Sequence, residues 1–416
     1  MKHRSLRFAA LVVLLSACSW TMAGHGPDRR GWSRFDTAIT PANAATLTPG
    51  WTASGLAGYT ETIGNNDLVF ARGPDEVRAL ARTSGAEKWR ASYQGTSIPA
   101  LTGDVLTVST GGGHCAVTQV RAADNAPIRS VAMGGPDVTG TIGGGVSSCA
   151  ARSVFADEHR IIVAWHYVGF SPAPHCPLAW EIADGITAFL PDLSAPWETQ
   201  TTQGGCGPPP VPLPLTSPYS GATRAGDVYL FNYAGSISAM PVACGTVCTP
   251  RWQIPINGAW VMGLSDTRAA AVDVTGHLTV FDVATGATVW TGSVGATTEV
   301  GMAATDTSIF VPTIDGTLYA FAVGGCGAPT CSPAWTASIG SVPRSRPSIA
   351  GNVVYVSGND TKLKMFAASG CGTATCTSVG TVTATAVIVG APTIINGRVF
   401  VNTLDYTLET FALPAP

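Results

Sequence analysis

The sequence is poor in charge, since only 12% of its 416 residues are Asp, Glu, Lys or Arg and the formal net charge is −3. A basic stripe or an acidic tail is lacking, so the chain offers no electrostatic footprint for the phosphate backbone of a nucleic acid. Nucleic acids are therefore not expected among its partners.

The sequence also has little that would form long helices. With 48 Gly and 29 Pro it is rich in turn residues, and the apolar residues between them fall in short alternating runs. Such runs are typical of half-buried strands, whereas no amphipathic helical pattern follows the first 23 residues. The composition predicts an all-β fold.

The motifs of several enzyme classes are missing. The sequence contains no Gly-x-Ser-x-Gly elbow and no adjacent Cys-Cys pair, and its Gly-rich runs lack the Lys of a phosphate-binding loop. Its Cys and His spacings match no metal-ligand motif. We therefore expect no catalytic residue and no metal site.

What the sequence does contain is a repeat between residues 300 and 376. Leu318 and Leu363, Phe321 and Phe366, Cys326 and Cys371, and Cys331 and Cys376 are each separated by the same step of 45 residues, as in 363 − 318. Each unit has two alternating apolar runs around an Asp- and Gly-containing turn, then a short Cys loop. A period of about 40 to 50 residues with four short strands is typical of one propeller blade.

The remaining chain can be divided in the same way into eight four-stranded blades, or seven if the divergent second and third are one. The last unit, 391–411, ends before its fourth strand. Residues 46–54, which include Trp51, are predicted to supply that strand, so that N- and C-terminal strands close one blade. Closure would remove the exposed edges of an open array.

The first 23 residues are typical of an export leader, with a basic start and the short apolar core 8–15. Leu15-Ser16-Ala17-Cys18 resembles a lipoprotein cleavage signal, which would make Cys18 the acylated first residue of the mature chain. Cleavage after Ala23 is the alternative. Residues 24–39 are predicted to be a tether, in which residues 24–34 have too little apolar content to pack well, and residues 40–416 the propeller.

Ten Cys remain when Cys18 is set aside, an even number that suits an oxidising compartment outside the cytoplasm. Proximity in the sequence suggests five disulfides, and the last three have the shortest loops. The predicted pairs are Cys115 with Cys149, Cys176 with Cys206, Cys244 with Cys248, Cys326 with Cys331, and Cys371 with Cys376.

The segment Val280-Phe-Asp282-Val-Ala-Thr-Gly286-Ala-Thr-Val-Trp290 resembles the tryptophan-docking motif of propellers with pyrroloquinoline quinone (PQQ) type repeats. Partial copies end in Trp89, Trp252 and Trp335. Thr40-Pro-Ala-Asn43, which leads to Trp51, resembles the entry segment of the same family. The resemblance implies that these Trp, with Asp282 and Gly286, are structural docking residues.

The family contains both quinoprotein dehydrogenases and scaffold propellers that work without a cofactor. The resemblance implies that a dehydrogenase would need calcium-bound PQQ, an Asp base and an adjacent Cys-Cys disulfide. We could place none of these residues in this sequence, so no cofactor is expected. The alternative is a PQQ- and calcium-dependent oxidoreductase acting on alcohols or sugars.

The sequence therefore predicts a monomeric extracytoplasmic lipoprotein, anchored to the membrane through its lipid, that binds a protein, peptide or glycan of the cell envelope. Long loops at 170–181 and 191–219 place the expected binding region near the third blade.

Overall fold

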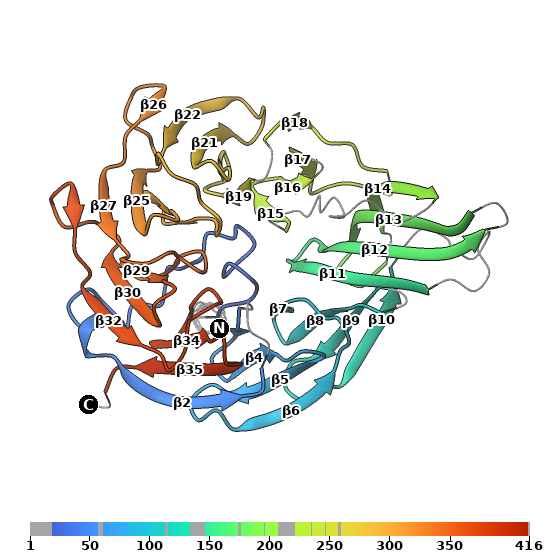
Figure 1. Cartoon of the computed structure of the whole chain (residues 1–416), viewed down its shortest axis with the longest axis horizontal. Coiled ribbons are helices and arrows are strands. Elements are labelled where there is room, and N and C mark those ends of the chain that lie inside the picture. The colour runs from blue at the N-terminus through green and yellow to red at the C-terminus, as the bar shows by residue number, and fades with distance from the viewer. Residues whose placement is uncertain are drawn as a thin grey trace, which may run out of the picture.

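The computed structural model describes residues 19–56, 61–112, 115–133, 146–173, 176–194, 196–206, 221–233, 235–245, 247–256 and 259–414. Within these residues eight antiparallel sheets are arranged around one axis as an eight-bladed propeller (Figure 1). Both the all-β prediction and the count of eight blades are confirmed.

The first four blades follow one another along the chain, with neighbouring strands paired in sequence order. Their strands are β3 (Ile63–Gly64), β4 (Leu68–Arg72), β5 (Glu76–Ala81) and β6 (Glu87–Ser92); β7 (Ala100–Thr102), β8 (Val105–Thr110), β9 (Ala116–Arg121) and β10 (Pro127–Ala132); β11 (Val146–Ala156), β12 (Ile161–Ala173), β13 (Cys176–Phe189) and β14 (Trp197–Cys206); β15 (Thr223–Ala225), β16 (Val228–Tyr233), β17 (Ser236–Pro241) and β18 (Trp252–Ile254).

The last four blades contain the repeat seen in the sequence. Their strands are β19 (Trp260–Gly263), β20 (Arg268–Val272), β21 (His277–Asp282) and β22 (Thr288–Ser293); β23 (Ala303–Ala304), β24 (Ser308–Pro312), β25 (Thr317–Ala322) and β27 (Trp335–Ser338); β28 (Ser348–Ala350), β29 (Val353–Ser357), β30 (Lys362–Ala367) and β32 (Gly380–Thr383); β33 (Thr393–Ile395), β34 (Arg398–Asn402), β35 (Thr407–Ala412) and β2 (Thr48–Ser54). Three short strands extend these sheets: β1 (Trp32–Ser33), β26 (Thr330–Cys331) and β31 (Thr375–Cys376).

The ring closes as predicted. β2, preceded by the 3₁₀ turn η1 (Ala44–Thr46), pairs antiparallel with the C-terminal strand β35, and Thr48 lies opposite Ala412. The two ends of the chain therefore share the eighth blade (Figure 1). This pairing gives β35 the partner that its own repeat unit lacks.

Strand pattern and turn chemistry explain the blade unit. In β24 and β25, Phe310 and Phe321 are fully buried between neighbouring sheets. The turn that joins the strands has Gly316 at φ 78°, a conformation that side chains with a Cβ rarely adopt, and Asp315 accepts a 2.6 Å hydrogen bond from the Thr313 hydroxyl. The period seen in the sequence is thus a period of buried aromatics and polar turns.

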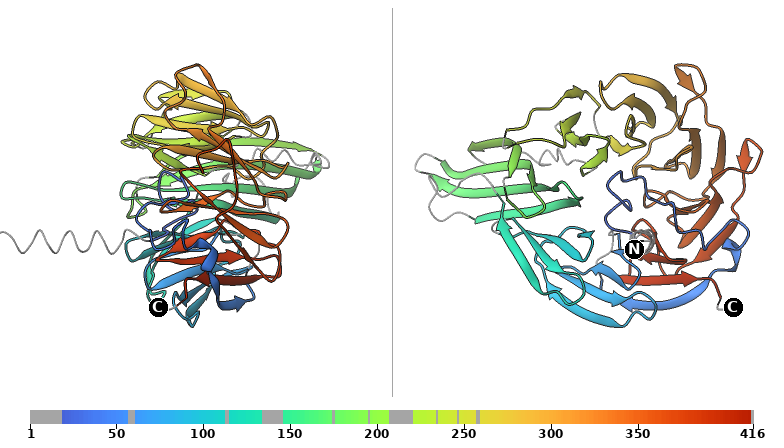
Figure 2. Two further views of the ribbon diagram at one scale, coloured as in Figure 1. Left: turned by 90° about the vertical axis from the view of Figure 1, so that its left-hand side faces the viewer. Right: turned by 180° about the vertical axis from the view of Figure 1, so that it is seen from behind.

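The third blade differs from the others in length. Its four strands have 10 to 14 residues and extend beyond the ring on one side (Figure 1, Figure 2), whereas the other strands described have two to seven. Most of the predicted loop 170–181 belongs to β12 and β13, in which Phe170 pairs with Trp180. The prediction of a loop there was wrong, because backbone pairing continues across the insertion. The Pro-rich stretch 207–214 lies outside the described residues.

Candidate functional site

Residues 19–36, here called the axial segment, run inside the circle formed by the first strands of the blades (Figure 1, Figure 2). The segment forms backbone hydrogen bonds with the first strands of six blades. These are Trp20 N to Gly64 O (2.8 Å), Leu101 N to Thr21 O (2.7 Å), Arg224 N to Pro27 O (2.7 Å), Gly263 N to Asp28 O (3.0 Å), Ala304 N to Arg30 O (2.9 Å) and Ile349 N to Gly31 O (2.6 Å).

A seventh blade is held by a side chain, because the Asp36 carboxylate accepts a 3.0 Å hydrogen bond from Gly397 N in the turn between β33 and β34. The first strand of a blade has one edge that its own sheet leaves unpaired. The axial segment supplies hydrogen-bond partners for that edge. Burial of the backbone N–H and C=O groups of these strands near the axis therefore costs little free energy. The chain thus crosses the centre of its own ring.

The axial segment is also anchored by buried side chains. Trp20, Met22 and Ser33 are at most 1% exposed, and Asp36 is 2% exposed. The prediction that residues 24–34 pack poorly was wrong, since Arg29 and Ser33 are buried. The low apolar content of the segment did not predict its packing, because the segment is held mainly through backbone hydrogen bonds rather than through a hydrophobic face.

A cluster of charged residues joins the axial segment to the ring. Arg346 donates to both oxygens of Glu61, at 2.7 Å from Nε and 2.5 Å from Nη2, and Gly24 N donates to the same carboxylate at 3.0 Å. The two side chains are only 16% and 11% exposed. Glu61 therefore fixes the segment at the turn that begins at Gly24.

Arg29 lies beside this ion pair and is 8% exposed. Among the described residues its Nε and Nη2 have no hydrogen-bond partner, and its φ of 52° is in the left-handed region. Burial, followed by repulsion from Arg346, lowers its pKa to about 10, while Glu61 acts to raise it. The guanidinium is therefore still charged at neutral pH.

Two cavities border the axial segment and share no lining residue. One, of about 350 Å³, is lined by Arg29, Glu61, Arg346 and apolar residues that include Trp260 and Met262. The other, of about 490 Å³, is lined by His25, Arg30 and residues of the fourth and fifth blades. The segment thus contributes a charged side chain to each cavity.

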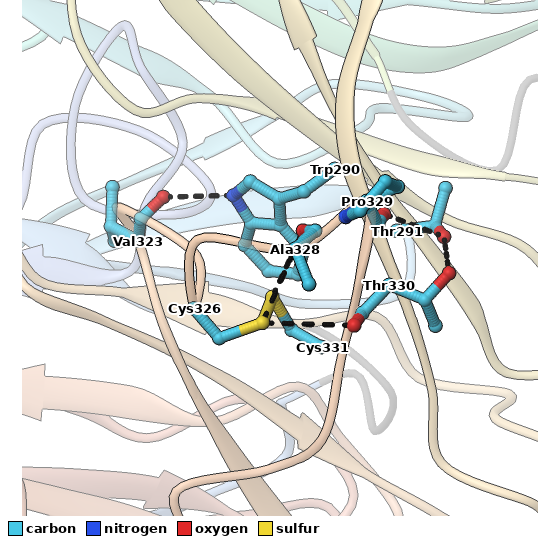
Figure 3. Close-up of a disulfide and its surroundings, with 8 residues drawn as sticks. All are labelled: Trp290, Thr291, Val323, Cys326, Ala328, Pro329, Thr330 and Cys331. Carbon is cyan, nitrogen blue, oxygen red and sulfur yellow. Dashed lines mark hydrogen bonds between the residues drawn. A yellow bond between two sulfur atoms is a disulfide. The ribbon is translucent and has the colours of Figure 1, made fainter.

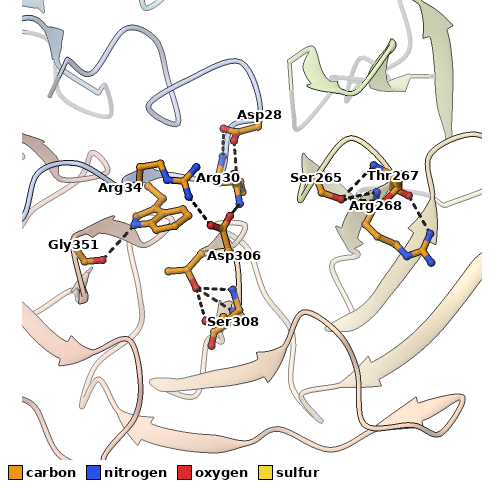
Figure 4. Close-up of polar contacts among 12 residues, drawn as sticks. Asp28, Arg30, Arg34, Ser265, Thr267, Arg268, Asp306, Ser308 and Gly351 are labelled. Atoms are coloured by element: carbon orange, nitrogen blue, oxygen red, sulfur yellow. Dashed lines mark hydrogen bonds and ion pairs between the residues drawn. The ribbon is translucent and has the colours of Figure 1, made fainter. Parts of the chain in front are cut away.

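At its C-terminal part the axial segment presents charge to solvent (Figure 4). Arg30 pairs with Asp28 at 2.7 Å and with Asp306 at 2.8 Å, and Arg34 pairs with Asp306 at 2.8 Å. The guanidinium groups of both arginines lie 5.2 Å from the centre of a Trp32 ring. Arg34 and Asp306 are about half exposed, so this group contributes less to stability than the buried pair at Glu61.

The Trp residues predicted to dock pack against the Gly of the next blade. A Cβ added to that Gly would lie 2.5 to 2.8 Å from the indole for Trp51 with Gly85, Trp252 with Gly286, Trp290 with Gly325 and Trp335 with Gly370. Trp89 instead donates to Ala122 O at 2.8 Å, in a turn where Asn125 has φ 60°. Asp282 accepts hydrogen bonds from Thr285 and Ala284, which lower its pKa and stabilise the turn.

Four of the predicted Cys pairs are present as disulfides, namely Cys115–Cys149, Cys244–Cys248, Cys326–Cys331 and Cys371–Cys376. Cys206 is also disulfide-bonded, while the side chain of Cys176 lies outside the part described. Figure 3 shows that the Cys326–Cys331 loop lies against the preceding blade, where Thr291 N donates to Pro329 O at 2.8 Å. There β26 pairs in parallel with β22, and β31 pairs with β27 in the same way.

Several predictions stay untested at their residues. Cys18 and the leader lie outside the described residues. Within the residues described, no three His, Cys, Asp or Glu side chains are grouped so that they could hold a metal ion. Nor does that part of the chain contain a helix with the length and apolar content to cross a membrane.

Sequence reasoning missed Arg29, Glu61 and Arg346. One signal was available, because Arg29, Arg30 and Arg34 fall within six residues of a chain in which charge is scarce. Glu61 and Arg346 gave no signal, since they are 285 residues apart and meet only when the ring closes.

Comparison with known proteins supports the repeat family. Residues 274–371 match the family model described as outer membrane protein assembly factor BamB. This part of the chain carries PQQ-type propeller repeats. The comparison with curated proteins gave no match.

Solved structures of two kinds share the fold. BamB from Moraxella catarrhalis is 14% identical, with a TM-score of 0.57 over 88% of this chain and 99% of that one. The quinohemoprotein alcohol dehydrogenase ADHIIG from Pseudomonas putida HK5 is 13% identical, with a TM-score of 0.64 over 98% and 83%. A europium-containing methanol dehydrogenase is 12% identical, with a TM-score of 0.64 over 97% and 100%. At these identities the likeness concerns the fold alone.

Proposed function

We propose that this PQQ-repeat propeller is a monomeric, lipid-anchored extracytoplasmic protein that serves as a non-catalytic binding module for a protein, peptide or glycan of the cell envelope. The observation that carries the proposal is the axial segment, whose backbone forms hydrogen bonds with the first strands of six blades around the centre of the ring. The outer surface of the ring and the projecting third blade are then the surfaces that a partner can contact.

Among the described residues of the ring we find no set that would hold calcium-bound PQQ. The axial segment forms hydrogen bonds with seven blades around the axis, and the described residues provide no group of three metal donors. The sequence has no adjacent Cys-Cys pair. These features favour a binding module over an oxidoreductase, although both kinds of protein share the fold.

The cofactor question has a direct test. Purified protein is incubated with PQQ and calcium, desalted, and assayed for quinone absorbance and for dye-linked oxidation of alcohols and sugars. We expect neither. One quinone retained per chain would contradict the proposal and favour the oxidoreductase.

We place the lipid at Cys18 because Trp20 and Met22 are buried parts of the ring. Cleavage after Ala23 would remove both side chains and the hydrogen bonds of Trp20 with Gly64. Cleavage before Cys18 keeps them. The acylated residue would then be two residues from the buried Trp20, so the ring would lie close to the membrane surface.

Mass spectrometry of the protein purified from envelopes is expected to find an acylated N-terminal Cys18. Cys18→Ala should release the protein or stop its processing. A mature N-terminus at Gly24 would rule out the anchor.

The proposed binding region is the third blade, whose strands extend beyond the ring (Figure 2). To test it, residues 170–181 are replaced by a two-residue turn together with Cys206→Ser, since the predicted partner Cys176 is removed, and partners are captured by cross-linking in native envelopes. Val247→Ser is a matched surface control, since Val247 is 85% exposed on another blade. The proposal expects the captured species to be lost only from the shortened blade, and capture by both variants would place the site elsewhere.

A further inference from the structure

The turn between β33 and β34 combines the sequence Asn396-Gly397 with a buried carboxylate. Ile395 pairs with Arg398, so the two residues alone form the hairpin turn, with φ of 51° and 72°. The Asn396 side chain is exposed. Gly397 N donates to both oxygens of Asp36, at 3.0 and 3.2 Å, and a backbone hydrogen bond from Asn396 reaches the same carboxylate. An exposed Asn-Gly turn is thus joined to the axial segment through its backbone N–H groups.

The N–H of Gly397 is the group that reacts when an Asn-Gly sequence loses its amide. Asn is a thermolabile residue, and Gly has no Cβ to hinder the reaction. Gly397 N loses its proton and forms a bond to Cγ of Asn396, while the bond from Cγ to the side-chain nitrogen breaks and that nitrogen leaves as ammonia with the proton. Water then opens the cyclic imide at one of its two carbonyl carbons. The product is an aspartyl or isoaspartyl residue in place of Asn396.

The contact with Asp36 opposes the first step of this reaction. The proton that must leave Gly397 N is held in hydrogen bonds to a carboxylate, and a negative charge on that nitrogen would lie beside the charge of Asp36. Asp36 is 2% exposed, so water screens the repulsion little. The turn is therefore protected while it is docked on Asp36, and it loses this protection when the axial segment detaches.

The product of the reaction would in turn oppose docking. Deamidation gives Asn396 a carboxylate, and the backbone of this residue already forms a hydrogen bond with Asp36. Two carboxylates at such a short separation repel each other, and burial of one of them strengthens the repulsion. The contact between Asp36 and Gly397 joins the axial segment to the eighth blade. A modified turn would therefore hold the axial segment less firmly.

We propose that Asn396 is a latent deamidation site, which the docking of Asp36 suppresses and whose modification weakens the same docking. A chain whose axial segment detaches for long periods would acquire a lasting chemical mark at this turn. The proposal concerns the chemistry of the closed ring, and it can fail or succeed independently of the binding role and of the lipid anchor.

The test measures deamidation of the mature protein at pH 7 by mass spectrometry of its proteolytic peptides. Asn257-Gly258 is the other Asn-Gly of the sequence and serves as the internal standard. The rate at each site in the folded protein is divided by the rate at the same site in urea. Asn396 is expected to react at least about tenfold more slowly in the folded protein, because a charge-assisted hydrogen bond must first be lost. Equal rates in the two states would overturn the proposal.

Asp36→Asn keeps the size of the side chain and removes its charge. In the folded variant the rate at Asn396 is expected to rise by about tenfold, since a charge-assisted hydrogen bond becomes a neutral one, while the rate at Asn257 stays unchanged. Asp124→Asn removes an exposed carboxylate from another blade and should leave both rates unchanged. An unchanged rate at Asn396 in Asp36→Asn would show that the geometry of the turn protects the site, and would overturn the proposal.

Asn396→Asp reproduces the product and tolerates the positive φ as Asn does. It is expected to lower the melting temperature of the otherwise native chain and to have little effect when Asp36→Asn is also present, because the repulsion needs both charges. Equal shifts in the two backgrounds would contradict the proposal. Should Asp36→Asn fail to fold, or raise the rates at both Asn-Gly sites, Asn396→Asp alone decides, since an unchanged melting temperature would count against the proposal.

Discussion

At the scale of single residues, the axial segment concentrates ionisable groups in places from which water is largely excluded. Arg29 and Asp36 are buried, Nε2 of the partly exposed His25 is shielded from water, and Glu61 holds the segment through Gly24 and Arg346. In such surroundings the loss of one charge leaves its partner without compensation. Substitutions here should therefore have larger effects than at surface pairs.

Glu61→Gln tests the buried ion pair. The substitution leaves Arg346 and the neighbouring Arg29 without a counter-charge, so we expect a loss of about 3–5 kcal/mol in the free energy of unfolding. Urea denaturation measures it. Asp124→Asn is the control, because the Arg121–Asp124 pair is about half exposed and solvent screening leaves it little effect on stability. Equal losses in the two variants would contradict the buried role of Glu61.

His25 should make stability depend on pH. Burial lowers its pKa from 6.5 to about 4 in the folded protein, so between these values the unfolded chain binds a proton that the folded chain does not. Stability is then full above pH 6.5 and falls as the pH decreases towards 4. One pH unit in this window corresponds to about 1.4 kcal/mol.

The comparison variant is His25→Asn, since Asn tolerates the φ of 77° at this position. Between pH 7 and pH 4.5 it should lose about 2–3 kcal/mol less stability than the native protein. Denaturation curves at the two pH values measure the difference. If the two proteins lose equal stability, His25 is not the group responsible.

At the scale of elements, neighbouring blades are joined where a Trp of one blade meets a Gly turn of the next. Trp290 lies against Gly325 and donates to Val323 O at 3.1 Å, while the Cys326–Cys331 loop continues the sheet as β26 (Figure 3). The docking motif and the Cys loop are therefore parts of one contact between blades. Its strength depends on the absence of a Cβ in the turn.

Gly325→Ala tests this contact. The new Cβ would lie 2.8 Å from the Trp290 ring, and the backbone φ is 76°. Gly295→Ala has nearly the same φ, 69°, but nothing within 4 Å of the new Cβ. Both variants should lose about 1–2 kcal/mol of unfolding free energy through backbone strain. Gly325→Ala should lose about 1–3 kcal/mol more through the clash with Trp290. Thermal unfolding of the pair isolates the contact, and equal losses would show that docking tolerates the methyl group.

At the scale of the whole molecule, two segments close the ring. β2 completes the eighth blade at its outer edge, and the axial segment connects seven blades at the centre. Both come from the first 54 residues of the chain. Folding of the ring therefore depends on contacts between the start of the chain and strands hundreds of residues away.

Removal of residues 19–23 should weaken the whole ring. A chain that starts at Gly24 lacks Trp20 and Met22, which are 0% and 1% exposed. Truncation of a buried Trp alone typically costs about 3–5 kcal/mol, so the melting temperature should fall by several degrees. Trp20→Ala in the longer chain should reproduce most of the loss. Equal melting temperatures for the two chains would remove the structural argument for cleavage before Cys18.

Much of the fold could be predicted because it depends on patterns among residues that are close in the sequence. The 45-residue step between Phe321 and Phe366 records the burial of one aromatic per blade, and the missing fourth strand after Phe411 pointed to closure by the segment around Trp51. Close Cys pairs such as Cys326 with Cys331 needed only a short loop. Periodicity and turn chemistry are properties of neighbouring residues, so a single sequence reveals them.

By itself, then, the sequence determined the all-β class, the blade unit, the closure of the ring and the short disulfides. Only the tertiary structure decided the course of residues 19–36 and the surroundings of Arg29. The physical reason is that the partners of this segment are backbone groups of the first strands, which every residue type carries and which therefore leave no pattern in the sequence. Burial of Arg29 beside Glu61 and Arg346 likewise exists only once the ring has brought distant residues together around the axis.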